Sequence, residues 1–355
     1  MTTAAQAQAQ PSQAPRQHVL IGGGSGFIGT ELAEALRARG DRVTLISRTP
    51  GVDRMTWDEI KANGIPDCDL VINLAGKHIL DMRKRWTSSY KEEVIRSRID
   101  TTRALVQAIN QSANPPSTFI STAGKCFYGS QAYARTEEYL DLDEHSDPVG
   151  IDFPAELVSR WEAAAEGIDS SRVRHVKLRF GIVLASAKRG AKRGARQSNK
   201  QDEQGRSFGA RGIFPMLHAA FRYGFCVGMG SGAQPFPWIH IKDVVGILLR
   251  AIDHDNMQGV FNAVAPGIVS NKAFTALLAT KLNRWVLGRI PAWLIKAVVG
   301  KERSTILLLG QRVKPRRTLE SGYRFQFAEL SDCLDDLLSA EQLQTPTAQQ
   351  MELGA

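Results

Sequence analysis

A glycine-rich turn near the start of the sequence has the residue types and spacing that bind a pyrophosphate. Gly23, Gly26 and Gly29 lie three residues apart, after the apolar run His18 to Ile21 and before a segment with apolar residues at helical spacing. The early glycine permits a tight turn, Gly26 lets the backbone approach the phosphates, and Gly29 lets helix and strand pack closely. Free N–H groups at the helix N-terminus favour negative charge there. The turn predicts a dinucleotide site; the alternative is a tight turn without a ligand.

The end of the second predicted strand selects the type of dinucleotide. Residues Arg42 to Arg48 are rich in apolar side chains, and the strand ends in Ser47, Arg48 and Thr49 without an acidic residue. An acidic residue at this tip would bind a free ribose 2′-hydroxyl, whereas an arginine accommodates a 2′-phosphate. Arg48 therefore favours NADP (NADPH) over NAD, although it also fits an ordinary solvent-facing arginine.

Hydroxyl groups follow a later predicted strand, Thr118 to Thr122, in the run STAGKCFYG. In open α/β sheets ligands bind at the carboxyl edge, so Ser121 or Thr122 is placed to polarise a substrate carbonyl. Tyr128 lies six residues further on and is a candidate proton carrier. The alternative reading makes the hydroxyls strand-end caps and the tyrosine a loop hydrogen-bonding group.

Strands and helices alternate along the first half of the sequence, and this order implies a parallel sheet. The further strands are predicted at Cys68 to Leu74, which ends in Ala75-Gly76, and at Val173 to Gly181. Helices are predicted at Tyr90 to Ile109 and at Phe153 to Gly167. The predicted fold class is α/β, a Rossmann-type doubly wound parallel sheet with a smaller C-terminal substrate lobe.

Composition fits a globular protein with a large core. The sequence has 355 residues and four cysteines that are far apart, so neither a disulfide framework nor a zinc site is predicted, and no metal is expected. The longest apolar stretch, Ile290 to Val299, is interrupted by Pro291 and Lys296 and is too short to span a bilayer. We expect a cytoplasmic protein, no membrane partner and an oligomeric state that the sequence leaves open.

The net charge of +9 is concentrated in one segment. Residues 185–212 contain eight basic and two acidic residues and are rich in Gly, Ser and Gln, which predicts a flexible basic insertion. No aromatic residue precedes Phe208 there, so specific nucleic-acid binding is not expected. The predicted division is a disordered leader (1–17), an NADP-binding Rossmann domain whose sheet can take a further strand from later in the chain (18–184), the basic insertion (185–212), a smaller C-terminal lobe (213–343) and a tail (344–355).

Several short motifs in a fixed order resemble those of the extended, epimerase-like short-chain dehydrogenase/reductases. The sequence is similar over residues 18–330 to an atypical subgroup of that superfamily that ends in a C-terminal domain of unknown function. The motifs are GGGSGFIG, NLAG, RSRIDTTRAL, ISTAG with FYG, WEAAA, LRFGIVL, WIHIKDV, NAVAP and QRVKPRRTLESGYRF. The resemblance implies an NADP-binding Rossmann domain but no established substrate.

The resemblance also implies which residues hold the cofactor. The matched positions are Gly23, Gly26, Phe27, Ile28, Gly29, Ser47, Arg48, Leu74, Ala75 and Gly76, with Arg179 toward the nicotinamide side. Two features depart from the pattern of the subgroup. A long insertion lies between Leu184 and Phe214, and Lys125-Cys126 adds bulk after the STAG strand. We expect both departures to alter the mouth of the substrate site.

The usual proton-transfer pair of the superfamily is missing. In that pair a lysine follows a tyrosine by four residues and lowers the pKa of the tyrosine. None of the six tyrosines is followed by a lysine at that spacing. If chemistry occurs, we expect Thr122 or Ser121 to polarise a carbonyl and Tyr128, Asp152 or Glu156 to carry the proton.

Two classes of function remain open. One is an NADP(H)-binding, epimerase-like oxidoreductase that acts on a small hydroxy, keto or sugar-type substrate. The other is an NADPH-binding regulatory or sensor protein without catalysis, which the missing tyrosine–lysine pair favours. A third, weaker possibility is that the basic insertion binds a polyanion.

Overall fold

The computed structural model describes residues 16–79, 84, 86–130, 139–148, 152–186 and 212–342. The predicted tail lies outside these ranges, as do nearly all of the predicted leader and of the basic insertion. Each of these three predictions therefore remains a prediction.

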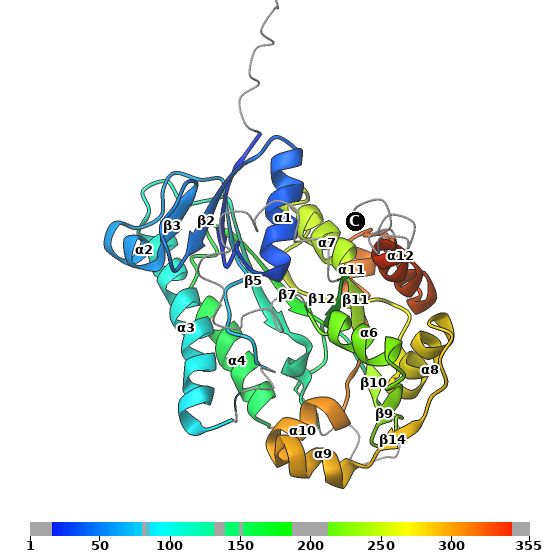
Figure 1. The fold of residues 1–355 in the computed structure, drawn as a ribbon. Coiled ribbons are helices and arrows are strands. Elements are labelled where there is room, and N and C mark those ends of the chain that lie inside the picture. The colour runs from blue at the N-terminus through cyan, green and yellow to red at the C-terminus, as the bar shows by residue number, and fades with distance from the viewer. Residues whose placement is uncertain are drawn as a thin grey trace, which may run out of the picture.

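Seven parallel strands form the central sheet in the order β12-β7-β5-β4-β1-β2-β3 (Figure 1). Pairing runs outward from β1 in both directions, to β2 on one side and to β4 on the other. This reversal defines a doubly wound sheet, as predicted, and ligands of such sheets bind beyond the carboxyl ends of the strands next to the reversal. The strands are β1 (His18–Gly22), β2 (Arg42–Ser47), β3 (Arg54–Thr56), β4 (Leu70–Asn73), β5 (Thr118–Gly124), β7 (Arg174–Phe180) and β12 (Gly259–Ala263).

Helices cover both faces of the sheet because each has one apolar side. On one face α1 (Phe27–Ala38) packs beside α7 (Ile241–Asp253), and their leucines and isoleucines share a core with β1 and β4. The other face carries α2 (Trp57–Asn63), α3 (Ser88–Gln111) and α4 (Phe153–Ala165), whose apolar side chains meet Leu20, Val71 and Phe119. Most of the side chains in both cores are fully buried.

A further core, separate from the two on the faces of the sheet, holds the smaller lobe together. It surrounds Trp238, Phe214 and Phe274, which are almost completely buried. The elements that form this core or belong to the lobe around it are β8 (Ile182–Leu184), α6 (Phe214–Arg222), β9 (Val227–Met229), β10 (Pro235–Phe236), β11 (Trp238–His240), β13 (Val269–Ser270), α8 (Asn271–Lys281), β14 (Gly288–Ile290), α9 (Ala292–Val299), α10 (Lys301–Leu308), β15 (Arg312–Val313), α11 (Arg316–Glu320) and α12 (Leu330–Gln342). The short strand β6 (Asp141–Leu142) pairs with β15.

The chain passes between lobe and sheet more often than a single boundary at residue 213 implies. Both α7 and β12 fall within the range predicted for the lobe, yet β12 extends the large sheet and α7 packs on α1. The buried carboxylate of Asp243 fixes this return because it accepts hydrogen bonds from the Tyr323 hydroxyl (2.9 Å) and the Gln326 N–H (2.7 Å). His240 is fully buried before α7, and its ring packs against that of Phe327 with the ring centroids 4.0 Å apart.

Within the described ranges, no helix combines the length and the apolar composition needed to cross a bilayer.

Candidate functional site

The glycine turn joins β1 to α1 at the carboxyl edge of the sheet, and its shape depends on missing side chains. Gly23 has φ +73°, and a Cβ there would lie 2.8 Å from the Ala75 backbone. A Cβ on Gly29 would lie 2.5 Å from the Gly23 carbonyl oxygen. Both glycines are therefore required by backbone contacts, and this agrees with the roles predicted for them.

The N-terminus of α1 is open to an anion. Gly26 precedes the helix, so no side chain caps the first N–H groups, and the first turn has no acidic residue. The N–H groups of Phe27 and Ile28 begin the helix and have no acceptor within it. Since Ser25 and Gly26 are exposed, a phosphate group can approach these N–H groups. The turn thus fits a pyrophosphate by its backbone alone.

The loop after β4 passes against this turn and is held by residues that the sequence did not single out. Buried Asn73 accepts a hydrogen bond from the Ala75 N–H (3.1 Å) and donates one to the Thr102 hydroxyl (2.9 Å). The Trp161 indole donates to the same hydroxyl (3.1 Å). These bonds fix the path of Leu74, Ala75 and Gly76. The motifs NLAG, RIDTTRAL and WEAAA contain or adjoin these residues, but nothing in their spacing pairs them.

The end of β2 lies next to the glycine turn, because the Gly23 N–H donates to the Ile46 carbonyl (3.2 Å). Ser47 is buried, and its hydroxyl donates to the Thr49 carbonyl. Arg48 is exposed and makes no side-chain hydrogen bond or ion pair within the described ranges. Its guanidinium is therefore available to a ribose phosphate.

The two predicted hydroxyls at the end of β5 point to different partners. The Thr122 hydroxyl donates to the Asn73 carbonyl (2.8 Å), so its proton is used within the protein. The Ser121 hydroxyl lies 2.8 Å from His175 Nε2, and burial lowers the pKa of His175 to about 4. Neither hydroxyl is exposed.

Tyr128 belongs to a buried polar network. Its hydroxyl donates to the Asn262 side-chain oxygen (2.9 Å) and accepts from Arg179 (3.0 Å), and burial raises the pKa of the tyrosine. Arg179 forms two parallel hydrogen bonds to Glu162, at 2.7 and 2.8 Å, and stacks over the Phe127 ring. Arg179 is thus engaged by protein groups on several sides, and Tyr128 is fully buried.

Lys125 begins the short 3₁₀ helix η1 (Lys125–Tyr128), directly beyond β5. It is 7% exposed, and its ammonium donates to the Gln311 side-chain oxygen. Gln311 in turn donates to the Gly129 carbonyl (2.9 Å). No carboxylate of the described residues pairs with Lys125. A buried ammonium bonded only to a neutral amide is an incomplete arrangement, because such a charge normally has an anionic partner.

A second cation lies beside the cofactor loop. Arg98 of α3 stacks on the Trp161 ring, and a Cβ on Gly76 would lie 3.0 Å from its guanidinium carbon. Its hydrogen bonds go to the Val94 carbonyl and the Ser97 hydroxyl, and burial lowers the pKa of Arg98 to about 10. It has no carboxylate partner among the described residues. Together with Lys125 it makes this edge of the sheet suited to anionic ligands.

The remaining predicted proton carriers have local partners. Asp152 accepts from the Ala155 N–H (2.9 Å) at the start of α4 and binds Ser130. Glu156 is exposed and pairs with Arg160 one turn later. Among the described His, Cys, Asp and Glu residues, no group of three gathers as metal ligands would.

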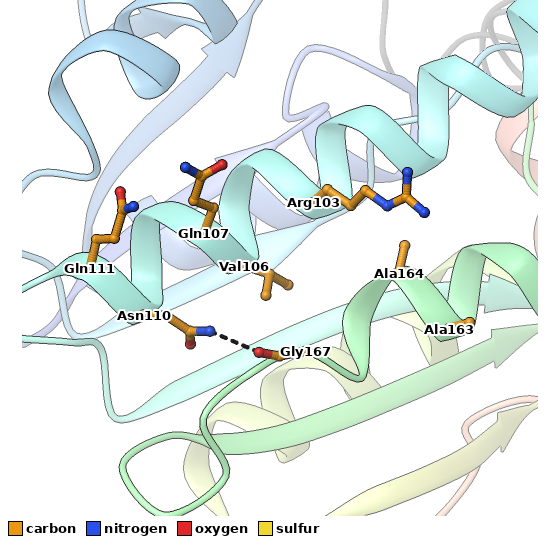
Figure 2. Close-up of a pocket in the computed structure, with 8 residues that line it drawn as sticks. All are labelled: Arg103, Val106, Gln107, Asn110, Gln111, Ala163, Ala164 and Gly167. Carbon is orange, nitrogen blue, oxygen red and sulfur yellow. Dashed lines mark hydrogen bonds between the residues drawn. The ribbon is translucent and has the colours of Figure 1, made fainter.

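A separate hollow of about 530 Å³ lies between α3 and α4 (Figure 2). Asn110 donates across it to the Gly167 carbonyl (2.7 Å). Because α3 ends and α4 ends near the amino edge of the sheet, this hollow is remote from the cofactor turn.

The sequence pattern of the NAD dependent epimerase/dehydratase family matches residues 19–149, and a domain of unknown function (DUF1731) matches residues 290–337. The human epimerase family protein SDR39U1 is 40% identical over 321 residues, which cover 90% of this chain and 99% of the relative. The chain belongs to the NAD dependent epimerase/dehydratase family. This confirms the family resemblance found in the motifs.

Two solved structures of related proteins have a similar fold over most of this chain. The crystal structure of human SDR39U1 with NADPH is 38% identical with a TM-score of 0.79, and the match covers 91% of this chain and 99% of the human chain. A nucleoside-diphosphate sugar epimerase from Corynebacterium glutamicum is 28% identical with a TM-score of 0.66, covering 96% of this chain and 61% of that one. The predicted Rossmann fold is confirmed, and the human relative carries the cofactor type that Arg48 predicts.

Proposed function

We propose that this family member is an NADP(H)-dependent, epimerase-like oxidoreductase acting on a small hydroxy, keto or sugar-type substrate. The observation that carries the proposal is the open N-terminus of α1 behind a glycine turn, with an exposed Arg48 at the neighbouring strand end that pairs with no side chain of the described residues. The NADPH in the structure of the human relative supports the choice of cofactor. The proposed cofactor residues are those predicted from the sequence.

When bound, NADPH supplies a hydride to a carbonyl carbon. The carbonyl oxygen then needs a proton and, before it, a group that stabilises its developing negative charge. We propose Lys125 for this position, because its buried ammonium at the end of β5 has donor capacity that Gln311 does not fill. A substrate bearing a carbonyl or carboxylate oxygen complements this charge.

The three hydroxyls predicted to be catalytic already have hydrogen-bond partners within the protein. Thr122 and Tyr128 already donate to protein acceptors, and Ser121 lies within bonding distance of His175. Each would have to exchange that bond for a substrate oxygen. The catalytic roles of these three residues remain proposals. We place Lys125 ahead of them because its ammonium can donate to a substrate oxygen without giving up an existing hydrogen bond.

The first test is turnover of NADPH by the purified protein with a panel of aldehydes, ketones and keto sugars. We expect substrate-dependent oxidation of NADPH that Lys125→Met abolishes and Lys125→Arg partly retains, because arginine keeps the charge. Binding of NADPH to both variants must be unchanged for this result to concern the chemistry. Full turnover by Lys125→Met would contradict the role of the lysine.

The alternative is a regulatory protein that binds NADPH without catalysis. The observation that favours it is Tyr128, whose hydroxyl is fully buried and bonded on both sides. Tight NADPH binding without oxidation by any substrate of the panel would favour this alternative. In cells, an intact function in Lys125→Met and its loss in Gly26→Val would point the same way.

Other expectations remain proposals with their own observations. A cytoplasmic location is proposed from the four cysteines, which are free in the structure. Association of the basic insertion with a polyanion would depend strongly on salt. Its removal between Lys188 and Arg206 without a change in polyanion binding would exclude that association.

A further inference from the structure

Exposed apolar side chains gather in one part of the lobe. Eight of the eleven large apolar side chains that are exposed in the described ranges fall between Tyr223 and Val298. Trp285 is 89% exposed and Trp293 is 69% exposed. Single exposed apolar residues are normal on protein surfaces, but a cluster with two such tryptophans marks a site of interaction.

The segments that carry these side chains are neighbours. The turn after α8 lies along the end of α6, because the Arg284 guanidinium donates to the Arg222 carbonyl and the Leu287 N–H donates to the Cys226 carbonyl. β14 pairs with β9 and leads directly into α9. In Figure 1, α8 lies at the right of the molecule, β9 and β14 at the lower right and α9 at the bottom. We call this surface the apolar-basic face; it comprises Arg222, Tyr223, Phe225, Arg284, Trp285, Val286, Leu287, Arg289, Trp293, Leu294, Lys296, Val298 and Lys301.

Helix α9 is the most unusual part of this face. Its sequence, AWLIKAVV, is apolar on nearly every side, yet only Ile295 is buried. It lies within the run from Ile290 to Val299, the longest apolar stretch in the sequence. A helix that is apolar all round is ordinarily buried in protein or in lipid. Here the described part of the protein leaves most of it uncovered.

The charge of the face has one sign. Neither the stretch 213–242 nor the stretch 256–301 contains an Asp or Glu. The five basic residues of the face, Arg222, Arg284, Arg289, Lys296 and Lys301, are exposed and form no ion pair within the described ranges. The acidic groups at its borders are engaged, since Asp335 pairs with Lys281 and Glu302 with Lys91. The face therefore complements a negatively charged surface.

We propose that the apolar-basic face docks on the surface of an anionic phospholipid bilayer. Tryptophan side chains settle at the boundary between headgroups and acyl chains, and lysine and arginine extend toward the phosphates. A second copy of the chain is a poor occupant, because a twofold contact would place these unpaired cations against their own counterparts. Docking of this kind needs no spanning segment. The earlier expectation of no membrane partner rested on the absence of such a segment, and the proposal is independent of the enzymatic one.

The test is co-sedimentation of the full-length protein with vesicles of phosphatidylcholine alone or mixed with phosphatidylglycerol. We expect binding to the anionic vesicles only. Trp285→Ser with Trp293→Ser should reduce the bound fraction at least about tenfold, and Arg284→Gln with Lys296→Gln should reduce it severalfold. The matched control is Val52→Ser, which removes an exposed apolar residue of the Rossmann domain and should change nothing.

The basic insertion needs its own control because it also carries positive charge. A variant with Lys188, Arg189, Lys192 and Arg193 changed to Gln should retain binding that depends on the two tryptophans. The proposal is overturned if wild-type protein ignores anionic vesicles, or if the insertion variant loses binding while the tryptophan variant keeps it. It is also overturned if the two tryptophans mediate dimerisation in solution and not vesicle binding. The same holds if the protein binds duplex DNA as well as it binds anionic vesicles. Unchanged melting temperatures and NADPH binding would show that the variants are folded.

Discussion

Gly29 illustrates how a single absent side chain shapes the cofactor turn. Its hydrogen faces the Gly23 carbonyl oxygen and the Gly24 Cα, both of them backbone atoms that cannot move aside without moving the turn. The sequence predicted this role from spacing alone, because glycine is the one residue that permits such an approach. The partners of Asn73, Arg179 and Lys125 could not be predicted in this way. The hydrogen bonds from Asn73 to Thr102, from Arg179 to Glu162 and from Lys125 to Gln311 join residues 29, 17 and 186 positions apart, which only the assembled fold brings together.

Gly29→Ala should therefore weaken NADPH binding by at least about tenfold, because the new methyl group displaces the backbone that receives the phosphates. Titration of intrinsic or NADPH fluorescence measures the effect. Gly167→Ala is the control, since its Cβ would make only an ordinary contact, 3.5 Å from Val106. Equal affinities for the two variants would show that the turn does not hold the cofactor as proposed.

The buried ion pair between Glu162 and Arg179 should contribute to the stability of the protein. Glu162→Gln should lower the free energy of unfolding by about 3 kcal/mol, because it leaves a buried guanidinium without its counter-charge. The exposed pair Glu156 and Arg160 on the same helix provides the comparison, and Glu156→Gln should cost less than about 0.5 kcal/mol. Urea unfolding of the two variants decides the matter. Similar costs would mean that the buried pair contributes no more than the exposed one.

At the scale of elements, the order of strands and helices was accessible from the sequence because each buries a face of regular period. The predicted strand and helix centres agree with β1, β2, β4, β5, β7, α3 and α4, and the boundaries differ by a few residues. The return of α7 and β12 to the large sheet could not be located from local pattern. Their apolar stripes would have fitted a separate lobe equally well, and the choice depends on contacts such as those of Asp243.

The start of α4 allows a helix-capping role to be separated from a chemical one. Asp152 accepts the Ala155 N–H, and asparagine is an equally good acceptor at that position. Asp152→Asn should leave the melting temperature nearly unchanged, whereas Asp152→Ala should cost about 1 kcal/mol. If Asp152 carries a proton during turnover, the asparagine variant will lose activity although its stability is unchanged. A loss of stability as large in Asn as in Ala would contradict the capping role.

For the whole molecule, His175 links stability to pH. Burial lowers its pKa to about 4 from an ordinary value of 6.5, so the folded protein keeps the imidazole neutral where the unfolded chain protonates it. The unfolded state therefore binds more protons between about pH 6.5 and 4, and stability falls as the pH falls through that window. The contribution lost is on the order of 3 kcal/mol.

Urea unfolding at pH 7, 6, 5 and 4 tests this link. The midpoint should fall more steeply with acidification in the wild type than in His175→Gln, which cannot be protonated. His18, which lies near the surface beside Asp67 and Asp69, offers a control through His18→Gln. Parallel curves for wild type and His175→Gln would show that another group governs the acid response.

Two surfaces of the molecule carry its proposed functions, the cofactor edge of the sheet and the apolar-basic face of the lobe. The cofactor edge combines an open helix N-terminus with Arg48, which lacks a side-chain partner among the described residues. The most direct test is titration of the wild-type protein with NADPH and with NADH, repeated with Arg48→Asp. We expect at least about tenfold tighter binding of NADPH, and a loss of that preference in the variant. Equal or tighter binding of NADH to the wild type, or no binding of either cofactor, would contradict it.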